Sequence, residues 1–311
     1  MINLLILSSD TSSLMVRNPY FLEQECAKST NLALYRDSGR ITQILKKIEF
    51  TPDFILLVND LGNQMSPLIK GLSSVKIPVG LMVNDVHRFT ETRRHFIRKN
   101  KIKHIFSIVR DTFYESYPEY KEKMIWLPHF INQDIYKDYG LKKDHDLLMM
   151  GAVNDVYPTR KKILHFYQNQ PHFTYHQHPG YEPTDLTNKN GIYIDKDYAM
   201  ELNRAKIFFT CPSIYHYPVK KYFEALACKT LLLAPTFKEL EDLGFIPGTH
   251  FVDIDEQNFM EKAKYYLDHV EERNKISEQG YKFVHQLHSL PIRAQQLVNK
   301  IEVIIKKERK S

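Results

Sequence analysis

The residues best suited to chemistry lie between Asn203 and Asp255. An apolar run at 207–211 is followed by a polar turn, a short helical pattern (KKYFEALA) and a second apolar run at 230–235. This alternation is typical of parallel strands joined by a crossover helix, and such sheets bind ligands at the carboxyl ends of their strands. Glu224 lies within the helical pattern, where its carboxylate can accept hydrogen bonds from a vicinal diol. Free amides at the start of the same helix can face a phosphate.

The turn before this helix supplies further candidates. It reads SIYHYPVKKY, and Pro218 can occupy the first helical turn without losing a hydrogen bond. Lys220 and Lys221 could stabilise a diphosphate leaving group beside the helix amides, or they could be ordinary solvated lysines. In the same turn, Tyr215 and Tyr217 could line a sugar pocket or simply pack, and Ser213 is a further candidate for the donor site.

A second strand–turn–helix pattern reads MMGAVNDVYPTRKK. Gly151 ends an apolar run and Pro158 opens a helical pattern. Such a turn can hold phosphates, although one glycine is a weaker signal than a full glycine-rich fingerprint. Arg160 carries the guanidinium that suits bidentate contact with phosphate, and Lys161 stands beside it.

A third turn, HQHPGY, follows the apolar run at 173–176. His178 and the Pro-Gly pair after it predict a tight turn at the carboxyl end of a strand. Tyr181 could stack on a nucleobase, and an ordinary turn is the equal alternative.

Short apolar runs separated by helical patterns recur along the chain. They lie at 3–8, 53–58, 77–83, 103–109 and 123–128, and again at 145–151, 173–176, 191–194, 207–211, 230–235 and 250–254. Helices are expected at 41–48, 93–99, from 158, and over 257–269, 271–287 and 291–308. Runs that are apolar throughout indicate parallel strands buried on both faces. We therefore predict an α/β protein with two doubly wound, Rossmann-like domains at 1–128 and 145–290, a linker at 129–144 and a terminal helix at 291–311.

Composition narrows the class of protein. The 311 residues are 43% hydrophobic and 26% charged, which suits two globular domains, and no apolar stretch approaches a membrane span. The first residues read as a buried strand rather than a signal peptide. Three cysteines without metal or redox spacing favour a reducing cytoplasm. We identify no Asp-Xaa-Asp motif of the kind that holds manganese, and the scattered histidines give no ligand pattern, so we expect no metal. A net charge of +6 suits nucleotide diphosphates, an anionic membrane surface or nucleic acid.

At residues 203–255 a resemblance to a known family emerges. The pattern of aromatic–Pro, two residues, Tyr/Phe, FEALAC and an apolar strand resembles the nucleotide-sugar half of retaining glycosyltransferases of the group 1 (family 4) clan. The chain is most similar to the spore-maturation (CgeB-like) branch, over about residues 125–290. The resemblance implies the GT-B architecture, two Rossmann-like domains facing a cleft, with the last helix crossing back to the first domain.

The resemblance also implies roles for single residues. Glu224 would bind the donor ribose, and Arg160 would grip the diphosphate. Clan members carry a second glutamate where this chain has His216, so His216 could contact the donor sugar. Asp85 and His87, in VNDVHRF, would face the cleft and orient donor and acceptor, although Asp85 could simply cap a helix. The clan's glycine-rich loop is absent from the first domain, which leaves Asp10 and Ser12 as weak acceptor-site candidates.

The sequence thus predicts a metal-independent, retaining glycosyltransferase that moves a sugar from a UDP- or GDP-sugar to an unknown acceptor. Front-face attack assisted by the leaving phosphate is what the resemblance implies. Two alternatives remain open. One is a glycosyltransferase acting on modified nucleic-acid bases, which the basic balance suggests. The other is a non-catalytic nucleotide-sugar-binding protein, which the missing glycine-rich loop and His216 suggest.

Overall fold

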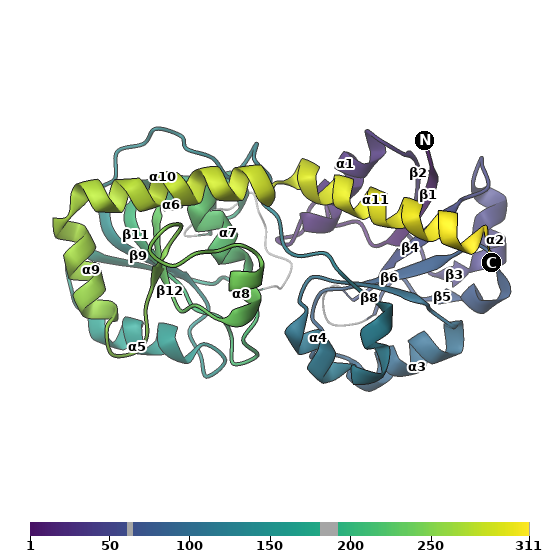
Figure 1. Ribbon diagram of the computed structural model, residues 1–311, viewed down its shortest axis with the longest axis horizontal. Coiled ribbons are helices and arrows are strands. Elements are labelled where there is room, and N and C mark those ends of the chain that lie inside the picture. Colours follow the sequence, from purple (N-terminus) through teal and green to yellow (C-terminus); the bar gives the residue numbers. More distant parts are fainter. Residues whose placement is uncertain (61–64, 181–191, 311) are drawn as a thin grey trace. The chain divides into compact units, whose positions relative to one another are not determined.

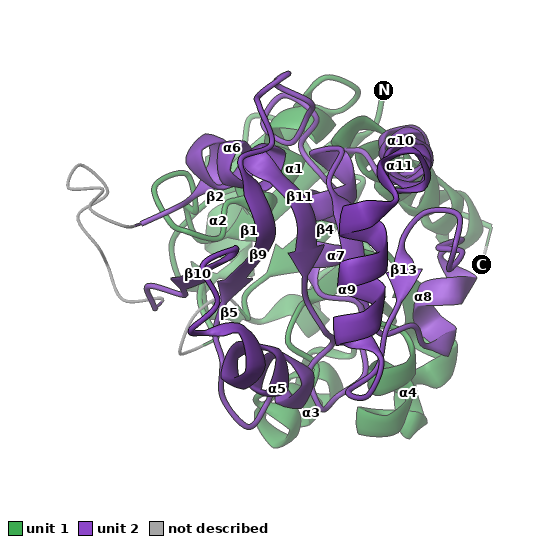
Figure 2. Ribbon diagram, turned by 90° about the vertical axis from the view of Figure 1, so that its left-hand side faces the viewer, with its two compact units in different colours: residues 1–128, 290–311 green, residues 129–289 purple. Residues whose placement is uncertain are grey.

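The chain folds into two compact units. In the computed structural model, which describes residues 1–60, 65–180 and 192–310, unit 1 comprises Met1–Pro128 and Leu290–Ser311, and unit 2 comprises His129–Ser289 (Figures 1 and 2). Residues 129–144, expected as a linker, group with unit 2. The chain therefore leaves unit 1 once and returns to it for its last helix.

Unit 1 is built on a six-stranded parallel sheet. Its strand order is β2-β1-β4-β6-β7-β8. The strands are β1 (Asn3–Ser8), β2 (Asn31–Tyr35), β4 (Phe54–Val58), β6 (Val79–Val83), β7 (His104–Ser107) and β8 (Met124–Trp126). All five apolar runs predicted in this half form strands. The order reverses between β1 and β4, and the carboxyl ends of these two strands mark the place where such a sheet binds ligands.

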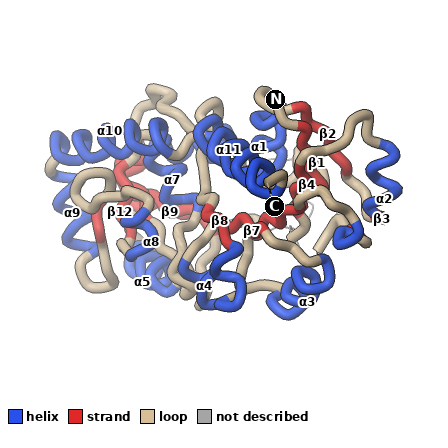
Figure 3. Tube along the Cα trace, turned by 45° about the vertical axis from the view of Figure 1, so that its right-hand side comes forward, coloured by secondary structure: helices blue, strands red, loops and turns tan. Residues whose placement is uncertain are grey.

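Helices, drawn in blue in Figure 3, and a small second sheet complete unit 1. The helices are α1 (Asn18–Ala27), α2 (Ile41–Ile44), α3 (Thr90–Asn100), α4 (Asp111–Ser116) and α11 (Leu290–Glu308), with 3-10 turns at Leu45–Lys47, Leu72–Ser74 and Pro118–Lys123. The short strands β3 (Gly39–Arg40) and β5 (Ile69–Lys70) pair with each other. Helix α11 packs against α1, and Arg309 at its end pairs with Asp53 before β4. The terminal helix thus belongs to the first unit.

Unit 2 holds a five-stranded parallel sheet in the order β10-β9-β11-β12-β13. The strands are β9 (His145–Gly151), β10 (Phe173–Gln177), β11 (Ala205–Phe209), β12 (Leu231–Ala234) and β13 (Val252–Asp253). The helices are α5 (Pro158–Tyr167), α6 (Asp195–Arg204), α7 (Lys220–Ala227), α8 (Lys238–Asp242), α9 (Phe259–Asp268) and α10 (Val270–Leu287). Here the order reverses between β9 and β11, which lie side by side in the sheet (Figure 1).

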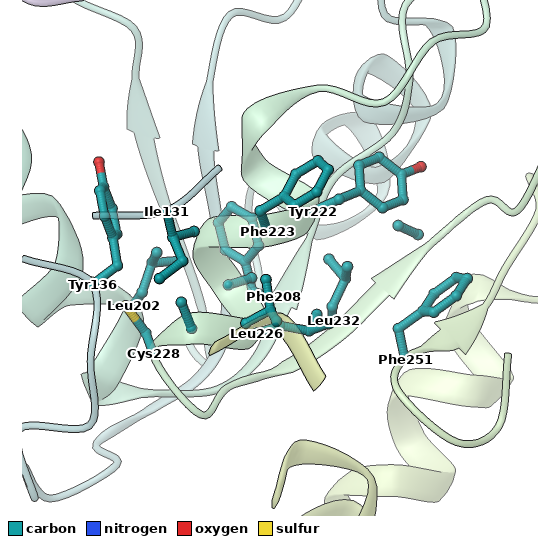
Figure 4. Close-up of a cluster of buried hydrophobic side chains, with 14 of the residues drawn as sticks. Ile131, Tyr136, Leu202, Phe208, Tyr222, Phe223, Leu226, Cys228, Leu232 and Phe251 are labelled. Atoms are coloured by element: carbon teal, nitrogen blue, oxygen red, sulfur yellow. The ribbon is translucent and has the colours of Figure 1, made fainter. Parts of the chain in front are cut away.

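Alternation along the strands of unit 2 explains its two helix layers. Leu147 and Met149 pack with Ile163 of α5 and Phe259 of α9 on one face. The intervening residues of β9 pack with α6 and α7 on the other face, in a cluster that contains Leu202, Phe208, Leu226 and Leu232 (Figure 4). Because both faces are buried, the strands are apolar throughout, as the sequence analysis assumed. The α/β prediction with parallel, doubly wound sheets is confirmed.

One predicted strand is wrong. Residues 192–194 form no strand and lead directly into α6. The apolar pattern there serves packing instead, because the Tyr193 ring lies 4.3 Å from the His176 ring of β10, between centroids. The remaining predicted strands and helices of unit 2 are present within a few residues of their expected bounds.

Candidate functional site

The carboxyl ends of β9 and β11 bring together two cations around a glycine. Gly151 ends β9 with a φ of +125°, a conformation that favours glycine. A Cβ atom at Gly151 would lie 2.7 Å from Cε of Lys221 and 3.5 Å from Nη1 of Arg160. The absence of a side chain therefore lets both cationic residues approach the end of the strand. The sequence predicted Gly151, Arg160 and Lys221 as donor-site residues, and the structure places all three together.

Arg160 is held in place by the backbone. It lies in the first turn of α5, is 3% exposed, and donates from Nη2 to the Cys211 carbonyl (3.0 Å) and from Nη1 to the Ala152 carbonyl (3.3 Å). Its guanidinium carbon lies 3.9 Å from the centre of the Tyr157 ring, a cation–π distance. The side chain thus links the end of β9 to the end of β11. Its charge is held at the switch point of unit 2, the place between these two strands where the strand order of the sheet reverses.

Lys221 supplies the second charge from a different element. It is the second residue of α7, and its ammonium lies 5.4 Å from the centre of the Tyr198 ring. Burial lowers the pKa of Lys221 to about 8; Glu224 opposes this shift, while Arg160 and Lys220 add to it. An anion beside Lys221 would favour its charged form and relieve its repulsion from Arg160.

Three buried polar atoms near these cations have no hydrogen-bond partner within the described residues. They are Nε of Arg160, Oγ1 of Thr210 and the hydroxyl of Tyr198. Thr210 follows β11 directly, and Tyr198 lies on α6 under Lys221. Buried polar groups are nearly always paired, so several orphaned atoms in one place indicate a site that a polar ligand or water completes. Neither Thr210 nor Tyr198 stands out in the sequence as a candidate for this site.

Glu224 lies on the same helix as the lysines. It is 4% exposed, and Lys220 pairs with it at 3.2 Å between Nζ and Oε1. Its charge also contributes to raising the pKa values of Tyr136 and Tyr198, for which burial is the main cause. A buried carboxylate with one cationic partner retains lone pairs that can accept hydrogen bonds from hydroxyl groups.

The turn residues lie close to this cluster in the chain. Ser213 is buried, and its backbone carbonyl and hydroxyl accept hydrogen bonds from the amides of His216 and Tyr215. His216 has a positive φ of 51°. The rings of Tyr215 and Tyr217 are nearly parallel, 6.2 Å apart between centroids. These contacts hold the turn in one shape before α7.

His178 follows β10 and faces the same charges. Burial lowers its pKa, and Lys221 and Arg160 lower it further. Its Nδ1 accepts a hydrogen bond from the Gly180 amide at 2.9 Å, so a neutral His178 carries its proton on Nε2, where it can donate. Tyr181, the predicted partner of a nucleobase, lies outside the described residues.

Lys161 is not brought to this cluster. Its ammonium pairs with Asp155 at 2.7 Å, and both side chains are well exposed. Lys162 likewise pairs with Glu256 on the surface. The reason is the helical repeat: Arg160 faces the sheet, so the next two residues of α5 face away from it.

Unit 1 places its candidates at the carboxyl ends of β1 and β6. Asp10 accepts a hydrogen bond from the Ser12 amide at 2.8 Å, which lowers its pKa. The side chain of Asp85 is 44% exposed, and its Oδ2 lies 3.6 Å from Nη1 of Arg88. Burial lowers the pKa of His87. Asp85 does not cap α3, because the N-cap position is Phe89 and no side-chain cap is formed.

A buried polar pair in unit 1 was missed. Asp60, after β4, and Arg93, on α3, form an ion pair at 3.0 Å with both side chains 1% exposed. Asn84 donates two hydrogen bonds to the Asp60 carboxylate, one from its backbone amide (2.8 Å) and one from its side-chain amide (2.9 Å). A repeat in the sequence could have pointed to Asp60, because Val-Asn-Asp occurs at 58–60 and again at 83–85, at the ends of two neighbouring strands.

The expectation of no metal overlooked three Asp-Xaa-Asp triplets, at 144–146, 195–197 and 253–255. Asp144 pairs with Arg204 at 2.9 Å, and Asp146 pairs with Lys206 at 2.5 Å. Asp195 and Asp197 lie in the first turn of α6, where negative carboxylates interact favourably with the helix dipole. Asp253 accepts from the Thr236 amide, and Asp255 from the amides of Gln257 and Asn258. Across the described residues, no group of three His, Cys, Asp or Glu side chains is arranged to hold a metal ion. Metal independence stays a prediction.

Comparison with known proteins adds the family context. Residues 160–299 match the family model described as glycosyl transferase-like. A search of curated proteins gave no match. Among solved structures, Anabaena Alr3699/HepE in complex with UDP and glucose is similar with a TM-score of 0.66 at 11% identity, covering 97% of this chain and 100% of that one. Sucrose-phosphate synthase from Thermosynechococcus elongatus has a TM-score of 0.65 at 13% identity, covering 98% and 100%.

A glycosyltransferase from Rickettsia africae is also similar, with a TM-score of 0.61 at 11% identity, covering 98% of this chain and 99% of that one. In the described part of the chain, no helix is long and apolar enough to cross a membrane. The matched segment contains Arg160, Lys221 and Glu224. The family match over residues 160–299 supports the prediction of a glycosyltransferase, and the solved structures show that the chain has the GT-B fold.

Proposed function

We propose that the protein transfers a sugar from a nucleoside diphosphate sugar bound at the switch point of unit 2. The observation that carries this proposal is the pair of cations, Arg160 and Lys221, meeting at the bare backbone of Gly151. A diphosphate carries enough negative charge to pair with both of these cations. The orphaned atoms of Arg160, Thr210 and Tyr198 supply further groups for the same ligand.

The chemistry of the proposed reaction is electrostatic. The bond between the anomeric carbon and the diphosphate oxygen breaks, and negative charge grows on the departing diphosphate. Arg160 is already oriented by two backbone carbonyls, so it stabilises this charge without reorganising. Lys221 adds a second positive charge at the same place. In the retaining course that we propose, the acceptor oxygen attacks the same face of the sugar, and its proton passes to the leaving phosphate.

Glu224 is proposed to bind the ribose hydroxyls and His178 to donate from Nε2 to the nucleotide. The turn with Ser213, His216 and Tyr217 would surround the donor sugar. Asp85, His87, Asp10 and Ser12 of unit 1 are proposed for the acceptor, whose identity is open. No side chain is proposed as a nucleophile, and no metal is required.

The donor is proposed to be a UDP-sugar, with a GDP-sugar as the second choice. The Anabaena structures contain UDP, UDP-glucose, and UDP with glucose, which supports UDP in a fold of this kind. A place in the spore-maturation branch and a cytoplasmic location are proposed on the sequence alone.

A donor panel tests the function. UDP-, GDP- and TDP-sugars are incubated with the protein, with and without a mixture of glycan and small-molecule acceptors, and nucleotide release is followed. We expect release from one nucleotide class, slow without acceptor and faster with one. Tight UDP binding in calorimetry without any release across the panel would favour a non-catalytic binding protein.

A further inference from the structure

Positive charge is segregated in unit 1. Unit 1 contains 24 Lys and Arg and 15 Asp and Glu residues, a net charge of +9. Unit 2 contains 19 Lys and Arg and 22 Asp and Glu residues, a net charge of −3. The basic balance of the chain therefore does not come from the diphosphate site, which belongs to the acidic unit. It requires a separate explanation.

Part of this charge surrounds a pocket at the amino ends of β6 and β7. The pocket has a volume of about 180 Å³ and is lined by residues of 72–79 and 100–104 and by Glu308. Lys76, Lys101 and Lys103 line it, and all three are exposed. Ligands of such sheets normally bind at the carboxyl ends of the strands, and this pocket lies at the opposite edge of the sheet.

The end of α11 extends the same surface. Four exposed basic residues flank Glu308 there. Together with the pocket lysines they form the amino-edge basic surface, defined as Lys76, Lys101, Lys103, Lys306, Lys307, Arg309 and Lys310. Its acidic neighbours balance only two members: Glu308 pairs with Lys103 at 3.1 Å, and Asp53 pairs with Arg309 at 2.6 Å. The other five members form no ion pair within the described residues.

The residue types of this surface fit an anionic lipid surface better than they fit nucleic acid. Six of its seven members are lysines, which act as point charges rather than as the planar forks that read base edges. No Phe, Tyr or Trp is a member of this surface or lines its pocket, so bases would find no stacking platform there. The outer face of α11 instead carries Val303, 48% exposed, one turn before Lys306 and Lys307. Lysines around an exposed aliphatic residue on an amphipathic helix are typical of binding to anionic lipid surfaces.

We propose that the amino-edge basic surface docks unit 1 on an anionic lipid bilayer. Lysine ammonium groups would contact headgroup phosphates, the pocket would receive one of them, and Val303 would enter the headgroup layer. The proposal does not depend on the donor site, because none of these residues belongs to unit 2. Binding would be reversible and weakened by salt, as expected for exposed charges.

Vesicle sedimentation tests the proposal with the full chain. Vesicles of phosphatidylcholine alone are compared with vesicles that contain phosphatidylglycerol, at low and at high salt. We expect binding only to the anionic vesicles and only at low salt. The triple variant Lys101→Gln, Lys306→Gln, Lys307→Gln should bind about a hundredfold more weakly, since each lysine near the surface contributes about fivefold. Adding Val303→Ser to this triple variant should weaken vesicle binding severalfold further.

A matched variant controls for charge alone. Lys142→Gln, Lys264→Gln, Lys275→Gln removes three exposed lysines of unit 2 and should bind anionic vesicles like the parent. UDP affinity should be the same in both triple variants, which separates this test from that of the proposed function. Equal loss in the two variants, or no binding of the parent at low salt, would overturn the proposal. Tighter binding of a single-stranded oligonucleotide, lost in the same variant, would assign the surface to nucleic acid instead.

Discussion

Lys220 and Glu224 form an ion pair across one turn of α7, with 3.2 Å between Nζ and Oε1. Lys221, one residue along, forms no ion pair within the described part of the chain and lies against Gly151. Two adjacent lysines therefore have different environments. Lys220 balances a buried carboxylate, while the charge of Lys221 is left for a ligand. Sequence alone could not separate them, because their order along a helix does not say which one faces the strand end.

Replacing Lys221 should remove a diphosphate contact. Hydrogen bonds to charged groups contribute about 1.5–3 kcal/mol, so Lys221→Met should weaken UDP binding by at least about tenfold. The melting temperature should hold or rise, because the variant no longer buries an ammonium beside Arg160. Lys161→Met is the matched control: its lysine pairs with Asp155 on the surface. Equal UDP affinity for Lys221→Met and the parent in calorimetry would remove Lys221 from the site.

The pH dependence of UDP binding should report Lys221. Its pKa of about 8 means that the charged form is lost as pH rises through 8. A bound diphosphate raises this pKa, so binding takes up a proton in that window. UDP affinity should therefore be level below about pH 7 and fall above pH 8 by up to about tenfold per pH unit. Calorimetry at pH 8.5 in buffers of different ionisation enthalpy should detect proton uptake, and Lys221→Met should abolish it. A pH-independent affinity would contradict the assignment.

Glu224 should distinguish ribose from deoxyribose. If its carboxylate accepts from the ribose hydroxyls, the parent should bind UDP more than about tenfold tighter than 2′-deoxy-UDP, at about 1.5–3 kcal/mol for each charged hydrogen bond. Glu224→Ala should lose most of this preference. Lys220 is already 29% exposed, so water can solvate it after the change and the melting temperature should move little. A preference that survives in Glu224→Ala would show that another group reads the ribose.

Buried strands were the most predictable part of the fold. A strand covered on both faces must be apolar throughout, and each such run forms a strand except the one at 191–194, whose described residues 192–194 form none. The edge strand β2 was missed because it is only partly buried, with Leu34 36% exposed. The positions of Gly151, Arg160 and Lys221 follow from strand–turn–helix patterns. The contribution of Tyr198 does not, because it depends on how α6 packs over the site.

Chelation should leave UDP binding intact. Arg160 and Lys221 already provide two positive charges where a diphosphate would lie, so a divalent ion has less to contribute there. The three Asp-Xaa-Asp triplets have their own ion pairs, backbone partners or helix positions. UDP affinity measured before and after EDTA treatment should agree, and so should donor turnover. Loss on chelation with recovery on adding manganese would mean that one triplet holds a metal.

The two Val-Asn-Asp motifs of unit 1 should respond in opposite ways. Asp60 pairs with Arg93 at full burial, so Asp60→Ala leaves a buried guanidinium uncompensated and should cost about 3–5 kcal/mol of unfolding free energy. The side chain of Asp85 is 44% exposed, so water can replace its contacts, and Asp85→Ala, His87→Ala should change stability by less than about 1 kcal/mol. The double variant should still bind UDP, whose proposed site lies in the other unit, and should lose sugar transfer. Denaturant unfolding, calorimetry and turnover on the same preparations separate the two motifs. Parental turnover in the double variant would leave Asp85 and His87 without a role in the reaction, and an undiminished stability of Asp60→Ala would show that Arg93 finds another partner.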